Sequence, residues 1–141
     1  MSLAMSRSER ESFLADVHVG VVSIPRATRG PLAVPIWYAY TPGGQPWMIT
    51  DSQSLKGRLL ADAGAISLCA QSEALPYRYV AVEGPFTSTP ATADHMLEMA
   101  VRYLGATDGA AYAAGSSLET SIVVSIDPRS WLSVDYGKAP R

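Results

Sequence analysis

The sequence predicts a mostly β domain, in which six or seven antiparallel strands form a barrel with short helices at its periphery. Short runs rich in Val, Ile and aromatic residues recur along the 141 residues, and such runs are typical of strands. Tight turns containing Gly, Pro or Asp join most of them, which favours antiparallel pairing. The length predicts one domain, residues 1–141. The first seven residues are expected to lie outside its folded part, as a flexible or expression-derived segment.

The first half of the chain contains three predicted strands and two predicted helices. Ser8 and Glu11 have the spacing of a capping box and predict the first helix. The second helix is predicted after the polar residues 52–54, and Gly64 stands where its C-terminal cap belongs. The three strands are expected at 17–24, at about 32–40 with an interruption at Pro35, and at 46–50.

The second half of the chain completes the barrel and adds one clear helix. This helix is expected to begin at Thr89 or Thr92 and to end at Gly105, with Met96 and Ala100 on one face. The small residues that follow, 106–117, suit either a loop or a further short helix. The remaining strands are expected at 65–70, 77–87, 121–126 and 131–136.

Composition and charge exclude several classes of function. The formal net charge is −2 and like charges form no block, so we expect no nucleic-acid partner and no anionic membrane, both of which need clustered Lys and Arg. No apolar run is long enough to span a bilayer. The N-terminal residues lack the apolar stretch of a signal peptide, so the protein is expected to be cytoplasmic.

The common catalytic templates are not found in this sequence. His18 and His95 have no partner at metal-ligand spacing, so each is interpreted as structural or solvent-facing and no metal site is expected. The sequence has no Gly-x-Ser-x-Gly elbow and no Gly-rich phosphate loop before a helix. The single cysteine, Cys69, is expected to pack as a small apolar residue in a buried strand, with a reactive thiol as the alternative.

The segment from Thr50 to Lys56 has the composition of a phosphate-binding turn. It contains several hydroxyl groups, leads into a predicted helix and carries one of only two lysines in the chain. Exposed N–H groups at a helix start and a nearby cation favour a bound phosphate. The alternative is that Ser52 or Ser54 only caps the helix and that Lys56 is solvated, and this segment alone does not decide between the two.

The order of the motifs along the chain resembles the pyridoxamine 5′-phosphate oxidase-like family. The resemblance covers roughly residues 8–137 and is carried by loose motifs at the expected spacings. They are Pro35-Ile36-Trp37-Tyr38-Ala39-Tyr40, Gly44-x-x-Trp47-Met48-Ile49-Thr50, Ser54-x-Lys56, Ile66-Ser67-Leu68, the segment 77–84 that ends in Glu-Gly, and Ile126-x-Pro128-x-x-Trp131.

The resemblance implies a split β-barrel that works as a homodimer and binds a flavin-type cofactor across the dimer interface. It implies that Pro35, Ile36 and Trp37 run beside the cofactor ring. The phosphate would be held by Thr50, Ser52, Ser54 and Lys56. Tyr79 would approach the cofactor from its strand, Trp131 would come from the second subunit, and Arg78 is the candidate for the anionic tail of the cofactor. Trp37, Tyr38, Tyr79 and Met48 are the candidates for lining an apolar shelf above the ring, and alternation in the strands means that some of the four must face the core instead.

Two departures from the family pattern narrow the expected function. The C-terminal Arg-x-His segment of true pyridoxamine phosphate oxidases is missing. Leu55 stands where FMN-binding relatives often place an Arg beside the Lys. With nine arginines and two lysines, the composition also suits an actinobacterial source. The sequence therefore favours a reductase that uses the deazaflavin coenzyme F-420 and passes a hydride to an unsaturated small-molecule acceptor, whose identity the sequence does not give.

Two alternatives remain open at this point. One is an FMN-dependent oxidoreductase on the same fold, and the other is a non-catalytic protein that binds a flavin-like ligand. No side chain stands out as a proton donor.

Overall fold

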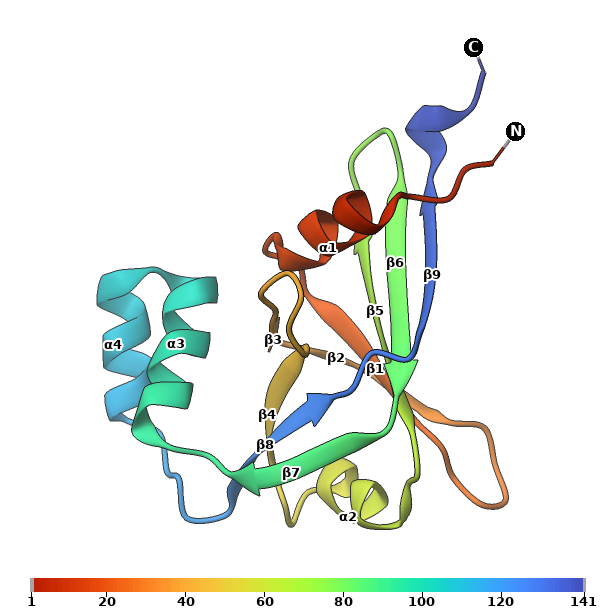
Figure 1. The fold of residues 1–141 in the computed structure, drawn as a ribbon. Coiled ribbons are helices and arrows are strands. Elements are labelled where there is room, and N and C mark those ends of the chain that lie inside the picture. The colour runs from red at the N-terminus through yellow and green to blue at the C-terminus, as the bar shows by residue number, and fades with distance from the viewer. Residues whose placement is uncertain (1, 141) are drawn as a thin grey trace.

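A computed structural model describes residues 2–140 as two antiparallel sheets surrounded by helices (Figure 1). The strands are β1 (Gly20–Ile24), β2 (Leu32–Ile36), β3 (Tyr38–Ala39), β4 (Trp47–Asp51), β5 (Ile66–Ser72), β6 (Arg78–Gly84), β7 (Phe86–Pro90), β8 (Ser121–Ile126) and β9 (Ser130–Asp135). The α-helices are α1 (Arg7–Ala15), α2 (Leu55–Asp62), α3 (Ala93–Leu104) and α4 (Ala106–Ala114), and a 3-10 turn, η1, covers Tyr136–Lys138. Among the described residues, no helix combines the length and apolar character that a membrane crossing requires.

The two sheets confirm the predicted class, a mostly β split barrel. The five-stranded sheet has the order β2-β1-β5-β6-β9 and the four-stranded sheet the order β3-β4-β8-β7. The strand count exceeds the predicted six or seven because two predicted strands are divided between the sheets. Trp37 separates β2 from β3, and Pro85 separates β6 from β7. The interruption expected at Pro35 is therefore wrong, since Pro35 lies within β2, an edge strand that tolerates a missing N–H.

The hydrophobic core lies between the two sheets and fills the interior of the barrel. Alternate residues of β1, β5 and β6 point inward, among them Val22, Leu68 and Val82, each at most 1% exposed. The four-stranded sheet contributes Met48 and Val124, which are equally buried. Burying one such aliphatic side chain stabilises the fold by about 1.5–3 kcal/mol. The alternating apolar residues therefore determine which face of each strand points into the core, and the opposite face stays available for binding.

Helix α1 packs across one end of the five-stranded sheet and ties down both termini. Its capping box is formed by Ser6 and Glu9 rather than by Ser8 and Glu11, so that prediction is wrong by two residues. The Lys138 ammonium donates a hydrogen bond to Glu9 at 2.8 Å and, with the Ser6 contacts, lowers the pKa of this carboxyl to about 2.

The expectation that the first seven residues lie outside the fold is also wrong for the described part of that segment. Met5 is 8% exposed and donates its backbone N–H to the Ser133 hydroxyl at 3.0 Å. The N–H of Asp135 in turn donates to the Leu3 carbonyl at 2.8 Å. Met1 lies outside the described residues. The N-terminal segment therefore runs beside β9, and both termini lie on the same side of the molecule (Figure 1).

Helices α3 and α4 form a hairpin between β7 and β8 that stands at the side of the barrel (Figure 1). Thr92 caps α3 through a reciprocal box with His95, which gives His95 a structural role. Gly105, at a φ of 86°, turns the chain into α4. This element decides the choice that the sequence offered for residues 106–117, a loop or a short helix, in favour of the helix. Gly109 lets the helices approach closely, because a Cβ there would lie 2.7 Å from the backbone of Val101.

Candidate functional site

The turn from β4 into α2 is folded by its own polar groups. Ser54 caps α2 by accepting the N–H of Gly57 at 3.1 Å, and its hydroxyl donates to the Asp51 carbonyl at 2.6 Å. The Asp51 carboxylate accepts the N–H of Gln53 at 2.8 Å. A side chain at Gly57 would collide with the backbone of Asp51 and Ser52, so glycine permits this tight turn. The local sequence thus forms the predicted helix start.

This turn leaves two donors and one cation available for an anion. Within residues 2–140, the N–H groups of Leu55 and Lys56 have no hydrogen-bond partner, as expected for the first turn of a helix. The Lys56 ammonium is not within 4 Å of any carboxylate of the described residues. A lysine in this position is unfavourable beside the positive end of the helix unless an anion binds there. The geometry therefore fits a phosphate group.

Two of the predicted phosphate-binding hydroxyls are brought together beneath this turn. Thr50 is 7% exposed, and its Oγ1 lies 3.5 Å from the Oγ of Ser54. The Ser52 N–H donates a 2.8 Å hydrogen bond to the Thr120 carbonyl, and its half-buried hydroxyl has no hydrogen-bond partner among the described residues. Thr50 and Ser54 therefore lie together at the start of α2, and phosphate binding by Thr50, Ser52, Ser54 and Lys56 stays a prediction.

Trp37 occupies the break between β2 and β3 and is held by aromatic contacts from the hairpin. Its ring stacks on Tyr103 with centroids 4.8 Å apart and planes 6° apart. Tyr112 of α4 approaches the same ring at 5.7 Å and 50°. The Tyr103 hydroxyl accepts the N–H of Tyr38 at 3.0 Å and lies 2.6 Å from the His18 carbonyl and 2.9 Å from the Tyr38 carbonyl. Tyr103 thus fixes both the backbone at the break and the plane of Trp37.

A pocket of about 290 Å³ lies between the α3–α4 hairpin and β4. Its volume is at the small end of the range for ligand sites and suits one ring system rather than a whole dinucleotide-sized cofactor. It brings together Trp37 and Thr50, two of the predicted site residues. The lining consists of Trp37, Ile49, Thr50, Asp51, Met96, Met99, Ala100, Tyr112 and Ser121. No sequence motif marks Met99, Tyr112 or Ser121 as site residues, and the only local signal was the shared helix face of Met96 and Ala100.

The other predicted site residues do not join this group within one chain. Pro35 and Tyr79 point to the outer face of the five-stranded sheet, since they alternate with the inward-facing Val34 and Val80. Ile36 is half-buried against the core. Trp131 packs edge-on against Tyr40 at 6.2 Å and beneath the Arg10 guanidinium at 4.6 Å, both from its own chain. Of the predicted shelf residues, Tyr38 and Met48 are wrong, because both are core side chains at most 1% exposed.

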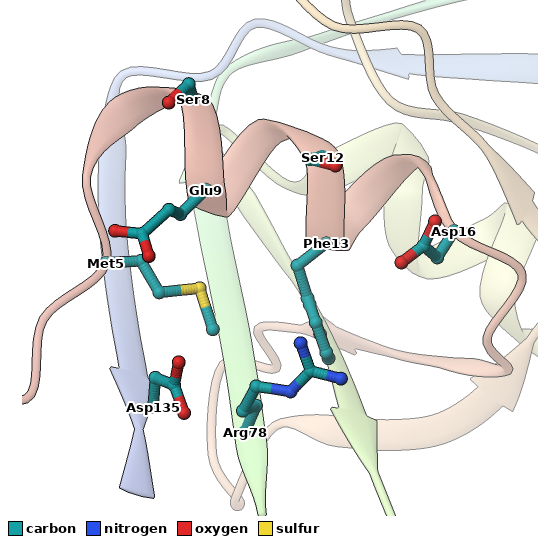
Figure 2. A pocket seen from close by; sticks show the side chains of 8 residues that line it. All are labelled: Met5, Ser8, Glu9, Ser12, Phe13, Asp16, Arg78 and Asp135. Atoms are coloured by element: carbon teal, nitrogen blue, oxygen red, sulfur yellow. The ribbon is translucent and has the colours of Figure 1, made fainter. Parts of the chain in front are cut away.

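Arg78 lies in a separate pocket beneath α1 (Figure 2). The pocket measures about 460 Å³, and the Arg78 guanidinium sits 5.1 Å from the centroid of the Phe13 ring. Its Nε is buried without a hydrogen-bond partner among the described residues. Asp16 and Asp135 line the same pocket, but neither forms an ion pair with it within 4 Å. The pocket includes none of the residues around Trp37 and Lys56, so a contact between Arg78 and the cofactor tail stays a prediction.

The outer face of the five-stranded sheet carries an uncovered apolar row. The strand register places Pro35 opposite Val21, Val21 opposite Cys69, Cys69 opposite Ala81 and Ala81 opposite Leu132. Val21 is 41% exposed and Leu132 60% exposed. Cys69 is half-buried on this face rather than in the core, which corrects the expected packing, and desolvation raises the pKa of its thiol. The cysteine therefore has the character of a protonated, apolar member of the row.

Comparison with known proteins shows the fold. No family model matches the sequence, and no curated protein matches it. Among solved structures, a conserved hypothetical protein from Mycobacterium tuberculosis matches with a TM-score of 0.81 at 21% identity, over 99% of this chain and 91% of that one.

Two further structures carry functional names. An F420 reductase matches with a TM-score of 0.70 at 21% identity, over 86% of this chain and 94% of that one. A pyridoxamine 5′-phosphate oxidase candidate from Listeria innocua matches with a TM-score of 0.70 at 9% identity, over 90% of this chain and 96% of that one. The chain therefore shares its fold with these proteins, and this fold is the split barrel that the motifs predict.

Proposed function

We propose that the protein is a cytosolic, homodimeric oxidoreductase that binds the deazaflavin coenzyme F-420 and reduces an unsaturated small-molecule acceptor. The observation that carries the proposal is the α2 start, where Lys56 has no carboxylate within 4 Å and the N–H groups of Leu55 and Lys56 have no partner among the described residues. Thr50 connects this turn to the pocket at Trp37. The fold shared with an F420 reductase supports the proposal. When bound, a reduced deazaflavin supplies a hydride, and the protein supplies binding, orientation and exclusion of water.

The residues of the α2 start fit a phosphodiester better than a phosphate monoester. The phosphate of FMN is a monoester with a charge of about −1.5 to −2 at neutral pH, whereas the phosphodiester of coenzyme F-420 carries one negative charge. Beside the two N–H groups without a partner, the α2 start offers one cation, Lys56, because Leu55 stands where a second would be expected and Arg58 comes only at the fourth helix position. A single ammonium and two backbone donors match a single charge, so the proposal favours deazaflavin over FMN.

In this proposal two of the other predicted residues, Pro35 and Tyr79, reach the cofactor through the contact with a second copy. The apolar row from Pro35 to Leu132 is the surface that two copies bury. A two-fold contact places the same row on both sides, which a flat sheet face of small and aliphatic side chains can satisfy. Pro35 and Tyr79 lie on this face, so dimer formation brings them to the edge of a shared cofactor site.

The proposal is tested by titrating the purified protein with coenzyme F-420 and with FMN while following cofactor fluorescence. We expect tighter binding of F-420. Lys56→Ala should weaken it roughly ten- to hundred-fold, because a charged hydrogen bond contributes about 1.5–3 kcal/mol. Lys138→Ala is the matched control, since it removes the only other lysine, which pairs with Glu9.

Three outcomes would contradict the proposal in different ways. Preference for FMN would assign the protein to the FMN-dependent oxidoreductases of the same fold. Binding of F-420 without turnover of any acceptor would indicate a carrier rather than an enzyme. Equal affinity of the Lys56→Ala variant and the parent would remove the phosphate from the α2 start.

A further inference from the structure

The pocket beneath the α3–α4 hairpin is built differently from the phosphate-binding turn beside it. Its walls are apolar and aromatic: Ile49 comes from β4, Met96 and Met99 from α3, and Tyr112 from α4, facing Trp37. Aromatic faces favour flat ring systems, and methionine side chains adapt to varied ring shapes. At about 290 Å³ it accepts one small ring system.

The polar end of the pocket presents a carboxylate, and no Lys or Arg of the described residues lines the pocket to offset it. Asp51, Thr50 and Ser121 lie there, and the Ser121 hydroxyl is committed to the Ser117 carbonyl at 3.2 Å. The Asp51 carboxylate has one oxygen bonded to the Gln53 N–H, and it forms no ion pair within 4 Å among the described residues. A carboxylate-bearing ligand would face this negative charge, whereas a hydroxyl or N–H donor would find an acceptor.

We propose that this pocket receives the ring of the hydride acceptor, and that Met96, Met99 and Tyr112 restrict it to flat, neutral molecules that carry a hydrogen-bond donor. The inference rests on the proposed function, because Thr50 and Trp37 connect the pocket to the turn assigned to the cofactor phosphate. In this proposal the hairpin forms one wall of the acceptor site, and β4 forms the opposite wall.

The inference is tested by NMR on protein labelled at the methionine methyl groups, with 2-naphthol as a flat, neutral probe. Met96 and Met99 line the pocket, while Met5 lies under α1 and Met48 in the barrel core, so the four methyls form an internal comparison. We expect 2-naphthol to shift the signals of Met96 and Met99 and to leave those of Met5 and Met48 in place. The titration is run with and without bound coenzyme F-420.

Matched variants and a charged probe sharpen the test. Tyr112→Ala should weaken 2-naphthol binding about tenfold, whereas Tyr136→Ala, which removes an equally exposed tyrosine elsewhere (both 51%), should not. The anion 2-naphthoate should bind at least tenfold more weakly than 2-naphthol, and Asp51→Asn should reduce that difference.

The outcomes separate this inference from the proposed function. Shifts at Met96 and Met99 in a protein that binds neither F-420 nor FMN would support a ring pocket but refute the cofactor assignment. If 2-naphthol left the Met96 and Met99 signals unshifted with and without F-420, or shifted all four methyl signals, the proposed ring binding in this pocket would be overturned. Displacement of 2-naphthol by F-420 would assign the pocket to the cofactor's own ring and would also overturn the inference.

Discussion

The two sheets of the barrel share one core but differ in what covers their outer faces. The α3–α4 hairpin lies over the four-stranded sheet, where His95 meets Trp47 at 5.5 Å and Tyr112 meets Trp37. The five-stranded sheet has no such cover over the apolar row from Val21 to Leu132 within the described residues. The first face is covered by the chain itself, whereas the second is the face on which we propose that a second copy packs.

This contrast separates two functions that a small barrel must combine. A binding pocket needs walls held at fixed positions, and Tyr103 provides this through its three contacts to the backbone at His18 and Tyr38. A dimer face needs a broad, flat and apolar surface, which strands provide without a helix above them. The hairpin and the bare sheet are therefore alternative uses of the same kind of strand face.

The largest expected effect comes from placing a charge on the bare face. Leu132→Arg should shift the protein from dimer to monomer, raising the dimer dissociation constant by more than about a hundredfold, because like charges brought together at an interface cost several kcal/mol. Analytical ultracentrifugation over a range of concentrations measures it. Leu75→Arg is the control, since Leu75 is 78% exposed in the loop between β5 and β6, outside the row. A Leu132→Arg protein that stays dimeric would show that the second copy does not sit on this face.

A smaller effect is expected where the hairpin meets the barrel. Tyr103→Phe keeps the stack on Trp37 but removes the hydroxyl that accepts the Tyr38 N–H. We expect a loss of about 1–3 kcal/mol in the free energy of unfolding, the cost of a buried donor without a partner. Urea unfolding followed by tryptophan fluorescence measures it.

Tyr112→Phe is the control for this change, because the Tyr112 hydroxyl has no hydrogen-bond partner among the described residues. It should leave the unfolding free energy nearly unchanged. Equal stability of the Tyr103→Phe protein and the parent would show that stacking alone holds the hairpin in place.

The sequence predicted the features that local chemistry determines. Ser54, Gly57 and Lys56 form a helix start from residues adjacent in the chain, so their grouping with Thr50 was foreseeable. Short runs rich in Val, Ile and aromatic residues also predicted the strands that form the barrel. They did not reveal which face of β3 and β4 points inward, so Tyr38 and Met48 stood among the candidates for a cofactor shelf although they fill the core.

What sequence reasoning missed depends on contacts between distant segments. Ser6 and Ser8 both stand three residues before a glutamate, and the choice of Ser6 follows from Met5 docking on Ser133 and Lys138 pairing with Glu9. Likewise, Met99 and Tyr112 look like ordinary helix residues until the hairpin is seen to lie beside Trp37. These pairings are set by tertiary packing, which leaves no periodic signal in the sequence.

The smallest expected effect lies at His18, in the segment that connects α1 to β1. Its ring stacks on Phe13 at 4.4 Å, and burial lowers its pKa from the ordinary value of 6.5. The unfolded chain therefore binds a proton more readily than the folded one as the pH falls below about 6.5, so stability should decrease in that range and be fully present above it. Urea unfolding between about pH 5 and pH 7.5 measures the slope, and His18→Phe should flatten it. Stability that instead rose on acidification in the parent, with the same slope in the variant, would show that the His18 ring does not cause this pH dependence.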